Sequence, residues 1–495
     1  MPPRLPLHTK LFFGTGQLAE GMMNTAFNAF LLLFYSQILG LPAWLGGLAL
    51  GIALAVDAVT DPMTGSLSDA LHHRWGRRHP FMYAAAIPLW ITFALTFRPP
   101  PELGNLALFG WMLGLTILAR LAMTLYHVPH LALGAELTSD YEERTSVVAF
   151  RNFCGLMGGV AVFVIARQLF LAPTEAYPNG QLNPGGYPGL GAFFGLAMAL
   201  AILASALGTH SRIPTLPVAG DVERFSFRRM ARELGEALSN DSFRPLFLGV
   251  LIFFVARGVA ISLDLYMGTF FWKLPTRQVL LIPVAGAIGI ALGTIFWSFA
   301  SRGREKKHVF VLCVIWFGTL TFLLPVLKIV GFYPPFESPL YAGLIFAFVF
   351  TAAFGAAGSL LTAGSMMADI ADEHELDVGR RQEGIFFGAL SFSGKAAVGA
   401  GSAIAGVALT LIEFPRQVAP DVVPPETVLA LAIIAGPAIS VLMLIGSLLM
   451  FRYGLTRERV AEIQRALAER RTPTHPSRSS MDSSDAPVAQ PAARG

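Results

Sequence analysis

The stretch WLGGLALGIALAVDAVTDPMTGSLSD, residues 44–69, decides the fold because it holds acids inside an otherwise apolar run. Asp57 and Asp61 are four residues apart, so on a helix both carboxylates project from one face. A helix rises about 1.5 Å per residue, which puts Asp57 roughly 20 Å beyond Trp44, deep in a hydrocarbon core about 30 Å thick. A carboxylate there is costly unless it is paired or faces a cavity. We therefore predict a cation site inside a membrane carrier; the alternatives are helix–helix contacts or a pair of protonated acids.

The composition places the whole chain in a membrane. Hydrophobic residues make up 54% of it, charged residues only 14%, and the mean hydropathy is +0.58, which excludes a water-soluble globule. The net charge of +4 does not indicate a nucleic-acid partner, because the basic residues are sorted by loop. Cys154 and Cys313 offer neither a disulfide framework nor metal-ligand spacing. Residues 11–39 lack a cleavage pattern, so we expect a first span there rather than a signal peptide.

Apolar runs and the residues that interrupt them predict an all-α membrane protein with twelve transmembrane helices. The predicted spans are residues 10–38, 43–70, 80–98, 105–136, 146–171, 190–210, 244–271, 278–301, 308–328, 340–370, 382–412 and 428–453. With the N-terminus inside, 25 of the 36 Lys and Arg residues fall on the cytoplasmic side and five on the other. The positive-inside rule then places both termini in the cytoplasm.

The chain divides into two halves. We expect an N-terminal six-helix half (residues 1–210), a cytoplasmic linker (211–243), a C-terminal six-helix half (244–453) and a cytoplasmic tail (454–495) that is largely disordered. Within the linker, FRRMARELGEAL has an amphipathic pattern that favours the membrane surface.

Two cytoplasmic turns in corresponding places suggest an internal duplication. ELTSDYEER (residues 136–144) is followed by Arg151, and DIADEHELDVGRR (residues 369–381) is followed by Lys395. Each is an acidic and then basic turn with a cation in the next helix. Two related halves around a central cavity are the common plan of secondary transporters.

Three motifs carry a resemblance to a known family. DAVTDPMTGSLSDALHHRWGRRHPF (residues 57–81), YHVPHLALGAELTSDYEERTSVVAFR (126–151) and MMADIADEHELDVGRRQEGIFFGALSFSGK (366–395) resemble the glycoside–pentoside–hexuronide:cation symporters. These proteins form the melibiose-carrier branch of the major facilitator superfamily. The resemblance implies a major facilitator fold and cation-coupled symport by alternating access.

The resemblance also implies roles for single residues. It places the Na⁺, Li⁺ or H⁺ site on Asp57 and Asp61, with Thr124 contributing, and it places Arg151 and Lys395 along the central polar cavity. Hard monovalent cations prefer oxygen ligands, which the carboxylates and the hydroxyl of Thr60 or Thr124 supply. The ammonium of Lys395, among small residues, needs a carboxylate partner, and either aspartate across the cavity fits.

The substrate side departs from the melibiose-type pattern. Glu20 lies one position from the place of the helix-1 carboxylate that binds galactosides, and Asn24 follows it by one turn. His127 occupies the place of a helix-4 aspartate, and the segment His127-Val128-Pro129 resembles the lysophosphatidylcholine carriers of the same branch. A structural and a functional role for His127 are both open. With Arg120, Arg151 and Lys395 available, an anionic substrate such as a hexuronide is favoured, and a lysophospholipid is the alternative.

Charged residues near the predicted cytoplasmic turns are candidates for gating. Asp69 and the arginines after it resemble the gating loop of the superfamily, while a plain topogenic loop is the alternative. The candidate gating residues are Asp69, Arg74, Arg77, Arg78, Glu136 and Arg144. Arg151 is open to another interpretation, a salt bridge with Glu136 or Asp140.

The sequence carries no enzyme signature, and it lacks a phosphate-binding Gly loop with Lys-Ser/Thr, which argues against ATP-driven transport. We therefore predict a Na⁺- or H⁺-coupled symporter of a glycoside, monomeric and without a cofactor, in a bacterial inner membrane. Its partners are a small-molecule substrate and the lipid bilayer. A carrier-fold sensor or scramblase is the competing class, although a sensor usually needs an attached output domain.

Overall fold

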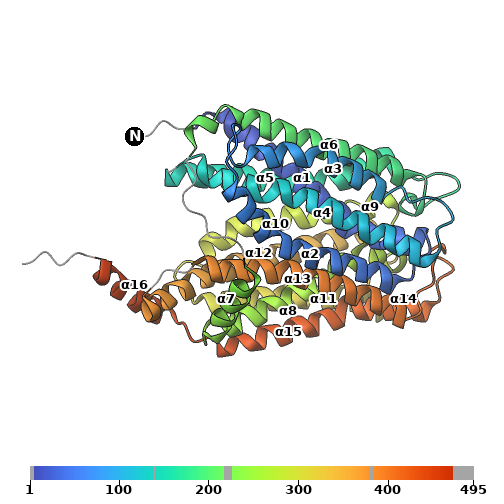
Figure 1. Ribbon diagram of the computed structural model, residues 1–495. Helices are drawn as coiled ribbons and strands as arrows, with labels where there is room; N and C mark the ends of the chain where they lie inside the picture. Colours follow the sequence, from blue (N-terminus) through green and yellow to red (C-terminus); the bar gives the residue numbers. More distant parts are fainter. Residues whose placement is uncertain (1–4, 139, 217–225, 380–382, 472–495) are drawn as a thin grey trace, which may run out of the picture.

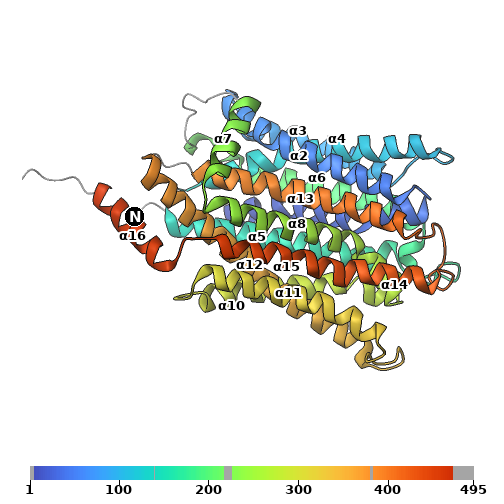
Figure 2. The same cartoon turned by 90° about the horizontal axis from the view of Figure 1, so that it is seen from below.

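The computed structural model describes residues 5–138, 140–216, 226–379 and 383–471, and throughout these ranges the regular structure is helical. Figures 1 and 2 show one elongated bundle of long, roughly parallel helices. Both described ends of the chain lie at one end of the bundle, with α7 and α16. We call it the terminal end, and the opposite end, with α9 and α14, the far end.

The first half of the bundle contains helices that pack mainly on one another. They are α1 (Leu7–Ala26), α2 (Ala43–Ala70), α3 (His79–Thr96), α4 (Asn105–Glu136), α5 (Tyr141–Ile165) and α6 (Gly186–His210). Helix α1 continues to the far end through two π-helical turns, Phe27–Leu31 and Phe34–Ile38, and α5 through a third, Ala166–Phe170. The first predicted span is therefore helical over its length but irregular in its second part.

The second half repeats this arrangement after a linker helix. Its helices are α8 (Phe243–Tyr266), α9 (Thr276–Val279), α10 (Ile282–Ala300), α11 (Lys306–Ile329), α12 (Leu340–Val378), α13 (Glu383–Leu411), α14 (Pro425–Ile433) and α15 (Ile439–Leu449). π turns follow α8 (Met267–Phe271) and join α14 to α15 (Ile434–Ala438). The linker helix is α7 (Phe227–Ser239), within the predicted amphipathic stretch.

Ten helices of the described chain are long and apolar enough to cross a membrane. The other two predicted spans, α1 with its π turns and α3, are also helical and lie inside the same bundle (Figure 1). The described residues thus form the all-α membrane architecture that we expected, and ten of the twelve predicted spans have the length and hydropathy of a membrane span. The largest difference in helix bounds is at α12, which continues to Val378, where Gly379 ends it in a left-handed conformation (φ 73°).

The expectation for the C-terminal tail needs a correction in its first part. Residues Arg457–Arg471 form α16, which packs against the end of α12. Its apolar side chains Ile463 and Leu467 are buried, and the backbone N–H of Arg457 donates to Glu305 (3.1 Å). Burial of these side chains gives the helix a tertiary partner that the polar composition of the tail did not reveal. Residues 472–495 lie outside the described ranges.

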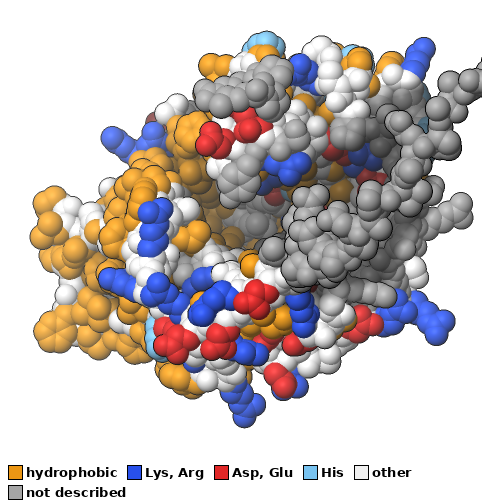
Figure 3. All heavy atoms as spheres, turned by 90° about the vertical axis from the view of Figure 1, so that its left-hand side faces the viewer, with side chains coloured by type: hydrophobic (Ala, Val, Ile, Leu, Met, Phe, Trp, Pro, Cys, Tyr) orange, Lys and Arg blue, Asp and Glu red, His pale blue; other side chains and the backbone are white. Residues whose placement is uncertain are grey.

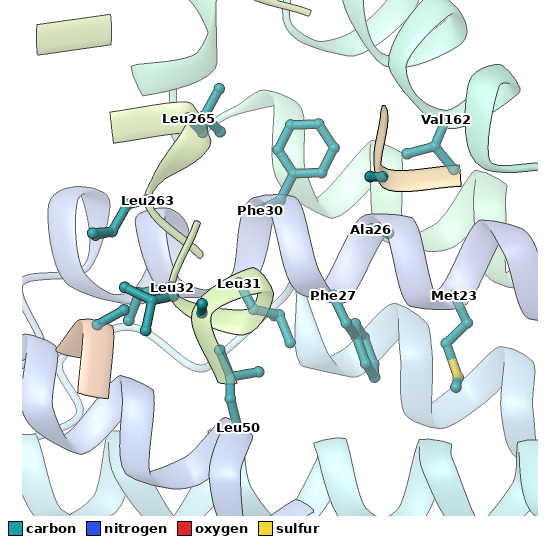
Figure 4. Close-up of a cluster of buried hydrophobic side chains, with 14 of the residues drawn as sticks. Met23, Ala26, Phe27, Phe30, Leu31, Leu32, Leu50, Val162, Leu263 and Leu265 are labelled. Atoms are coloured by element: carbon teal, nitrogen blue, oxygen red, sulfur yellow. The ribbon is translucent and has the colours of Figure 1, made fainter. Parts of the chain in front are cut away.

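The core runs through the middle of the bundle, around the second part of the first span (Figure 4). Phe27 and Phe30 are fully buried and pack on aromatic rings of the first half, and their π turn also contacts α8 of the second half. The first span therefore contacts the second half, and its irregular π turns lie where the two halves meet.

The halves are joined at the far end by hydrogen bonds between their loops and helix ends. Arg416 donates through Nη1 to the carbonyl of Gly40 (2.6 Å), and Gln417 donates to the carbonyl of Ile38 (3.1 Å). On another side, Thr276 donates to the side-chain oxygen of Gln181 (2.5 Å). The terminal face, in contrast, is hollowed near its centre and carries charges of both signs (Figure 3). These contacts hold the two halves together at the far end.

Candidate functional site

The two aspartates of α2 lie together at the centre of the bundle and share one hydroxyl. Thr124 of α4 donates to Oδ1 of Asp57 (2.7 Å) and lies 3.0 Å from Oδ1 of Asp61. The i, i+4 spacing puts both carboxylates on one helix face, as the sequence predicted. Pro62 follows directly and cannot donate to the carbonyl of Ala58, which leaves a backbone acceptor beside the pair.

Lys395 of α13 reaches across from the other half and contacts both carboxylates. Its Nζ lies 2.9 Å from Oδ2 of Asp57 and also bonds Oδ2 of Asp61. The side chain of Asp57 is 7% exposed, whereas that of Asp61 is 23% exposed. The sequence left open which aspartate the lysine would meet, and the structure pairs it with both.

Arg120 of α4 adds a second cation to this group. Its Nη1 lies 3.6 Å from Oδ2 of Asp57, and its guanidinium lies over the ring of Phe27, 5.8 Å from the centroid. Sequence reasoning noted Arg120 only as an available charge. Its position four residues before Thr124 was the signal that both side chains share one face of α4.

Thr60 is placed differently from our expectation. Its hydroxyl donates to the backbone carbonyl of Asp57 on its own helix (3.2 Å), so it serves the helix backbone rather than the carboxylates. Threonine in a helix often bonds a carbonyl one turn earlier. Of the two hydroxyls considered, the structure therefore brings only that of Thr124 to the aspartates.

A second polar cluster lies on α1. Glu20 accepts from the side-chain amides of Asn24 (2.5 Å) and Gln17 (3.0 Å). Gln17 in turn lies 3.4 Å from Nε2 of His127 on α4, which joins the two helices. Glu20, Asn24 and His127 were predicted as substrate residues and are brought together here. Gln17, three residues before Glu20, was missed although it shares the same helix face.

Arg151 of α5 lies apart from the acids at the terminal end that we considered as partners. Its guanidinium contacts the side chain of Asn152 (3.2 Å), and Glu20 is the acid that influences it electrostatically. The contacts described for Glu136 go to other arginines. The described contacts therefore do not place Arg151 in a salt bridge with Glu136, whose partners are Arg77 and Arg78.

Four of the predicted gating residues form one network at the terminal end of the first half. Glu136, at the end of α4, accepts from Arg77 and Arg78 (both 2.7 Å). Arg78 also pairs with Asp69 and donates to the hydroxyl of Ser68 (2.6 Å). Arg78 is buried, so these charge-assisted bonds replace its hydration. All of these residues belong to α2, α4 and the turn between α2 and α3.

Arg74 and Arg144 are not brought into this network. Arg74 lies over the ring of Trp75 (5.3 Å), and Arg144 donates to the carbonyl of Thr138 (2.9 Å). The sequence could not separate them from Arg77 and Arg78, because all four arginines sit in polar turns. In the second half, Lys306 pairs with Asp369 (2.6 Å) between the start of α11 and α12, much as Arg78 pairs with Glu136.

A family model described as MFS/sugar transport protein matches residues 12–457. The putative glycoside/cation symporter YagG of Escherichia coli (strain K12) is 26% identical over 476 residues, covering 94% of this chain and 96% of that protein. The sodium-dependent lysophosphatidylcholine symporter 1-A of Danio rerio is 30% identical over 182 residues, 36% of this chain and 34% of that protein.

Among solved structures, the inward-open conformation of the xylose transporter XylE from E. coli matches with a TM-score of 0.58. The match covers 92% of this chain and 98% of that one at 14% sequence identity, and at that identity it shows the fold alone.

Proposed function

The chain belongs to the MFS/sugar transport protein family, and we propose that it couples the movement of a cation to the symport of a glycoside. Membership and fold make it a multi-pass membrane transporter rather than an enzyme. One observation carries the proposal of coupling: the carboxylates of Asp57 and Asp61 in the first half are joined to Lys395 of the second half. A cation that competes with this lysine acts directly on the contact between the halves.

The coupling follows from alternating access, in which two halves rock about a central site. With the far end closed, Lys395 occupies the carboxylates. When the halves rock, the lysine withdraws with α13, and the carboxylates of α2 are left with a deficit of positive charge. A cation entering from the far side fills this deficit, since an uncompensated buried charge is costly. Return of Lys395 then displaces the cation at the terminal end.

The coupling ion in this proposal is Na⁺ or H⁺. Oxygen atoms suit a hard monovalent cation, and the site offers four carboxylate oxygens, the hydroxyl of Thr124 and the free carbonyl of Ala58. The carboxylates equally suit a proton. The name of the relative in Danio rerio includes sodium dependence, which supports a test of Na⁺ first.

The proposed orientation puts the terminal end in the cytoplasm of a bacterial inner membrane. Most of the lysines and arginines outside the spans fall on that side, which the positive-inside rule assigns to the cytoplasm. The closed far end then faces outward, and the described conformation is open to the inside. In this frame the network of Asp69, Arg77, Arg78 and Glu136 acts on the cytoplasmic side.

The substrate that we propose is a glycoside with a negative charge, such as a hexuronide. The α1 cluster supplies a carboxylate and two amides for sugar hydroxyls through Glu20, Gln17 and Asn24. Arg151 supplies a cation next to them, and charge-assisted bonds to an acid are the stronger kind. His127 lies at the edge of the same cluster and is a further hydrogen-bonding group for the ligand.

A lysophospholipid is the second candidate, and one structural observation favours it. The helices α5 and α10 come from different halves and touch only briefly. Their surfaces carry exposed apolar side chains, such as Phe153 (61%) and Ile295 (59%). A lipid substrate needs an apolar opening towards the bilayer, whereas a sugar needs a closed, water-filled path.

The proposal is tested with purified protein and proteoliposomes. Thermal stabilisation by a methyl glucuronide, its neutral glucoside and lysophosphatidylcholine, each with and without NaCl, identifies the substrate class. Uptake of the stabilising compound is then measured under imposed Na⁺ or H⁺ gradients. We expect stabilisation by the glucuronide and accumulation driven by one of the gradients. Stabilisation by lysophosphatidylcholine alone would select the lipid alternative, and uptake that neither gradient drives would refute coupling.

A further inference from the structure

Arg120 is a buried cation whose surroundings are not explained by helix packing. Its side chain is 2% exposed, and its Nε and Nη2 atoms have no hydrogen-bond partner among the described residues. Buried arginines normally use most of their five N–H groups. The described contacts of its guanidinium are with the carboxylate of Asp57 and the ring of Phe27. This arginine is therefore held at its place by charge rather than by a hydrogen-bond network.

The coupling site is electrically balanced in the described conformation. Asp57 and Asp61 contribute two negative charges, and Lys395 and Arg120 contribute two positive ones. The single hydroxyl proton of Thr124 lies within reach of Oδ1 of either carboxylate, and Lys395 contacts Oδ2 of both. The charges of these four side chains sum to zero, and Glu20, which also acts on Arg120 through space, acts in the same way on Arg151 in the α1 cluster.

The two cations of the site belong to different halves. Arg120 is on α4, which packs along α2 within the first half, and Thr124 on the same helix holds both carboxylates. Lys395 is on α13 of the second half. Rocking of the halves changes distances between them and preserves distances within each. The contact of Arg120 with Asp57 therefore persists through the cycle, whereas the contacts of Lys395 are broken.

On the basis of the cation coupling proposed above, we infer that Arg120 is the fixed counter-charge of the coupling site and limits it to one monovalent cation per cycle. After Lys395 withdraws, the pair of carboxylates beside Arg120 has a net charge of minus one. One Na⁺ or H⁺ restores neutrality, and a second ion would leave an uncompensated positive charge inside the protein. Arg120 anchors Asp57, so the more exposed Asp61 is the carboxylate that first meets the incoming ion.

Arg120 acts in this inference as a positioning residue, because it touches Asp57 and not the ion. Its effect is readable as the number of ions bound, which a merely structural role would not change. The matched control is Arg257 of α8, a mid-helix arginine that lies over the ring of Phe317 at 5.5 Å, nearly as Arg120 lies over Phe27. Arg257 belongs to the other half and is influenced by Asp264 rather than by Asp57.

The test counts the ions that the purified protein binds at saturation, as Na⁺ retained or as protons taken up, without substrate. For the wild-type protein we expect one ion per protein for whichever ion is effective. Arg120→Gln should bind two ions, or bind one at least tenfold more tightly. Arg120→Lys and Arg257→Gln should match the wild type.

Each outcome of this test decides something. Two ions bound per wild-type protein, or an Arg120→Gln variant with the wild-type number and affinity, would overturn the inference while leaving cation coupling intact. No binding of either ion by the wild type would instead refute the coupling. Should Arg120→Gln fail to fold, the wild type and Arg120→Lys still decide the matter, since two ions per protein in either one contradicts the inference.

Discussion

Two of the seams between the halves of this protein are built from different residues. Along the first seam, α2 packs closely on α13 over much of their length. A Cβ on Gly406 would lie 2.3 Å from the carbonyl oxygen of Ala43, and one on Gly47 would lie 2.6 Å from that of Ser402. Along the second seam, α5 and α10 touch only briefly and expose bulky side chains such as Phe296.

The two seams differ in the size of their residues, and this difference sets how closely the helices approach. Small residues let α2 and α13 approach so closely that the ammonium of Lys395 reaches the aspartates of the facing helix. The seam of α5 and α10 carries no comparable contact among the residues described and leaves apolar surface free for lipid. In the coupling that we propose, the first seam is therefore the one that senses the ion.

The largest effect on transport is expected when a carboxylate of the first seam is removed. Asp57→Asn or Asp61→Asn should abolish gradient-driven accumulation, a loss of tenfold or more, because the pair can no longer exchange Lys395 for a cation. Exchange of substrate down its gradient should partly persist. Uptake into vesicles with imposed Na⁺ or H⁺ gradients measures accumulation and exchange. Unchanged accumulation in the two variants would contradict the assignment of the cation site to Asp57 and Asp61.

The second-largest effect is expected on stability, when the close contact between α2 and α13 is disturbed. Gly406→Ala should lower stability by about 1–3 kcal/mol, the usual cost of overpacking, because its Cβ meets the backbone of Ala43. Gly114→Ala on α4 is the control, since a Cβ there meets nothing within 4 Å. Thermal unfolding in detergent compares the two. Equal midpoints would show that the seam tolerates more separation than its geometry indicates.

A smaller effect is expected from the charge network at the terminal end. Asp69→Asn removes one partner of Arg78 and should shift the balance of conformers, which differ by only a few kcal/mol. Because the network is intact in the conformation that we propose to be open to the inside, its loss should disfavour that conformer, and we expect labelling of a cysteine in the cavity from the cytoplasmic side to become several-fold slower. Arg74→Ala, outside the network, should not change the rate. Equal labelling in Asp69→Asn and the parent would leave the loop with a topogenic role only.

The far end should respond still more weakly. Arg416→Ala removes its bond to the carbonyl of Gly40, and a single such bond is worth about 1 kcal/mol, or roughly a fivefold change in population. The variant should therefore populate the outward-open conformer more than the parent does. Labelling of a far-end cysteine by an impermeant reagent measures this change. Slower labelling than in the parent would contradict the closing role of this contact.

The smallest effect is predicted for the second seam. Phe296→Ala on α10 should leave glycoside uptake within about twofold of the parent, because this exposed side chain faces away from the coupling site. A lipid substrate that passes between α5 and α10 would make the same change much more harmful. Uptake assays with the glucuronide and with lysophosphatidylcholine therefore sharpen both the comparison of the seams and the choice of substrate.

The sequence located the aspartate pair in advance because the pair depends on local properties, and the family resemblance added Thr124 and Lys395. An acid within an apolar run must lie at a certain depth, and a spacing of four fixes a shared helix face. Gln17 was not predicted as a site residue because burying an uncharged amide costs less than burying a charge and so does not mark a position in an apolar run. Arg74 and Arg144 were grouped with Arg77 and Arg78 because sequence position cannot tell which arginine of a polar turn reaches an acid on another helix.

What the sequence by itself determined is the membrane class, the path of the spans and the helices on which the buried charges lie. These follow from hydropathy and from the cost of placing charge in lipid, and both are properties of a single segment. Only the tertiary structure decided that Lys395 meets both aspartates, that Arg120 completes their charge balance and that α13 rather than α10 forms the tight seam. Those outcomes depend on how closely helices far apart in the chain approach, and that distance is set by packing.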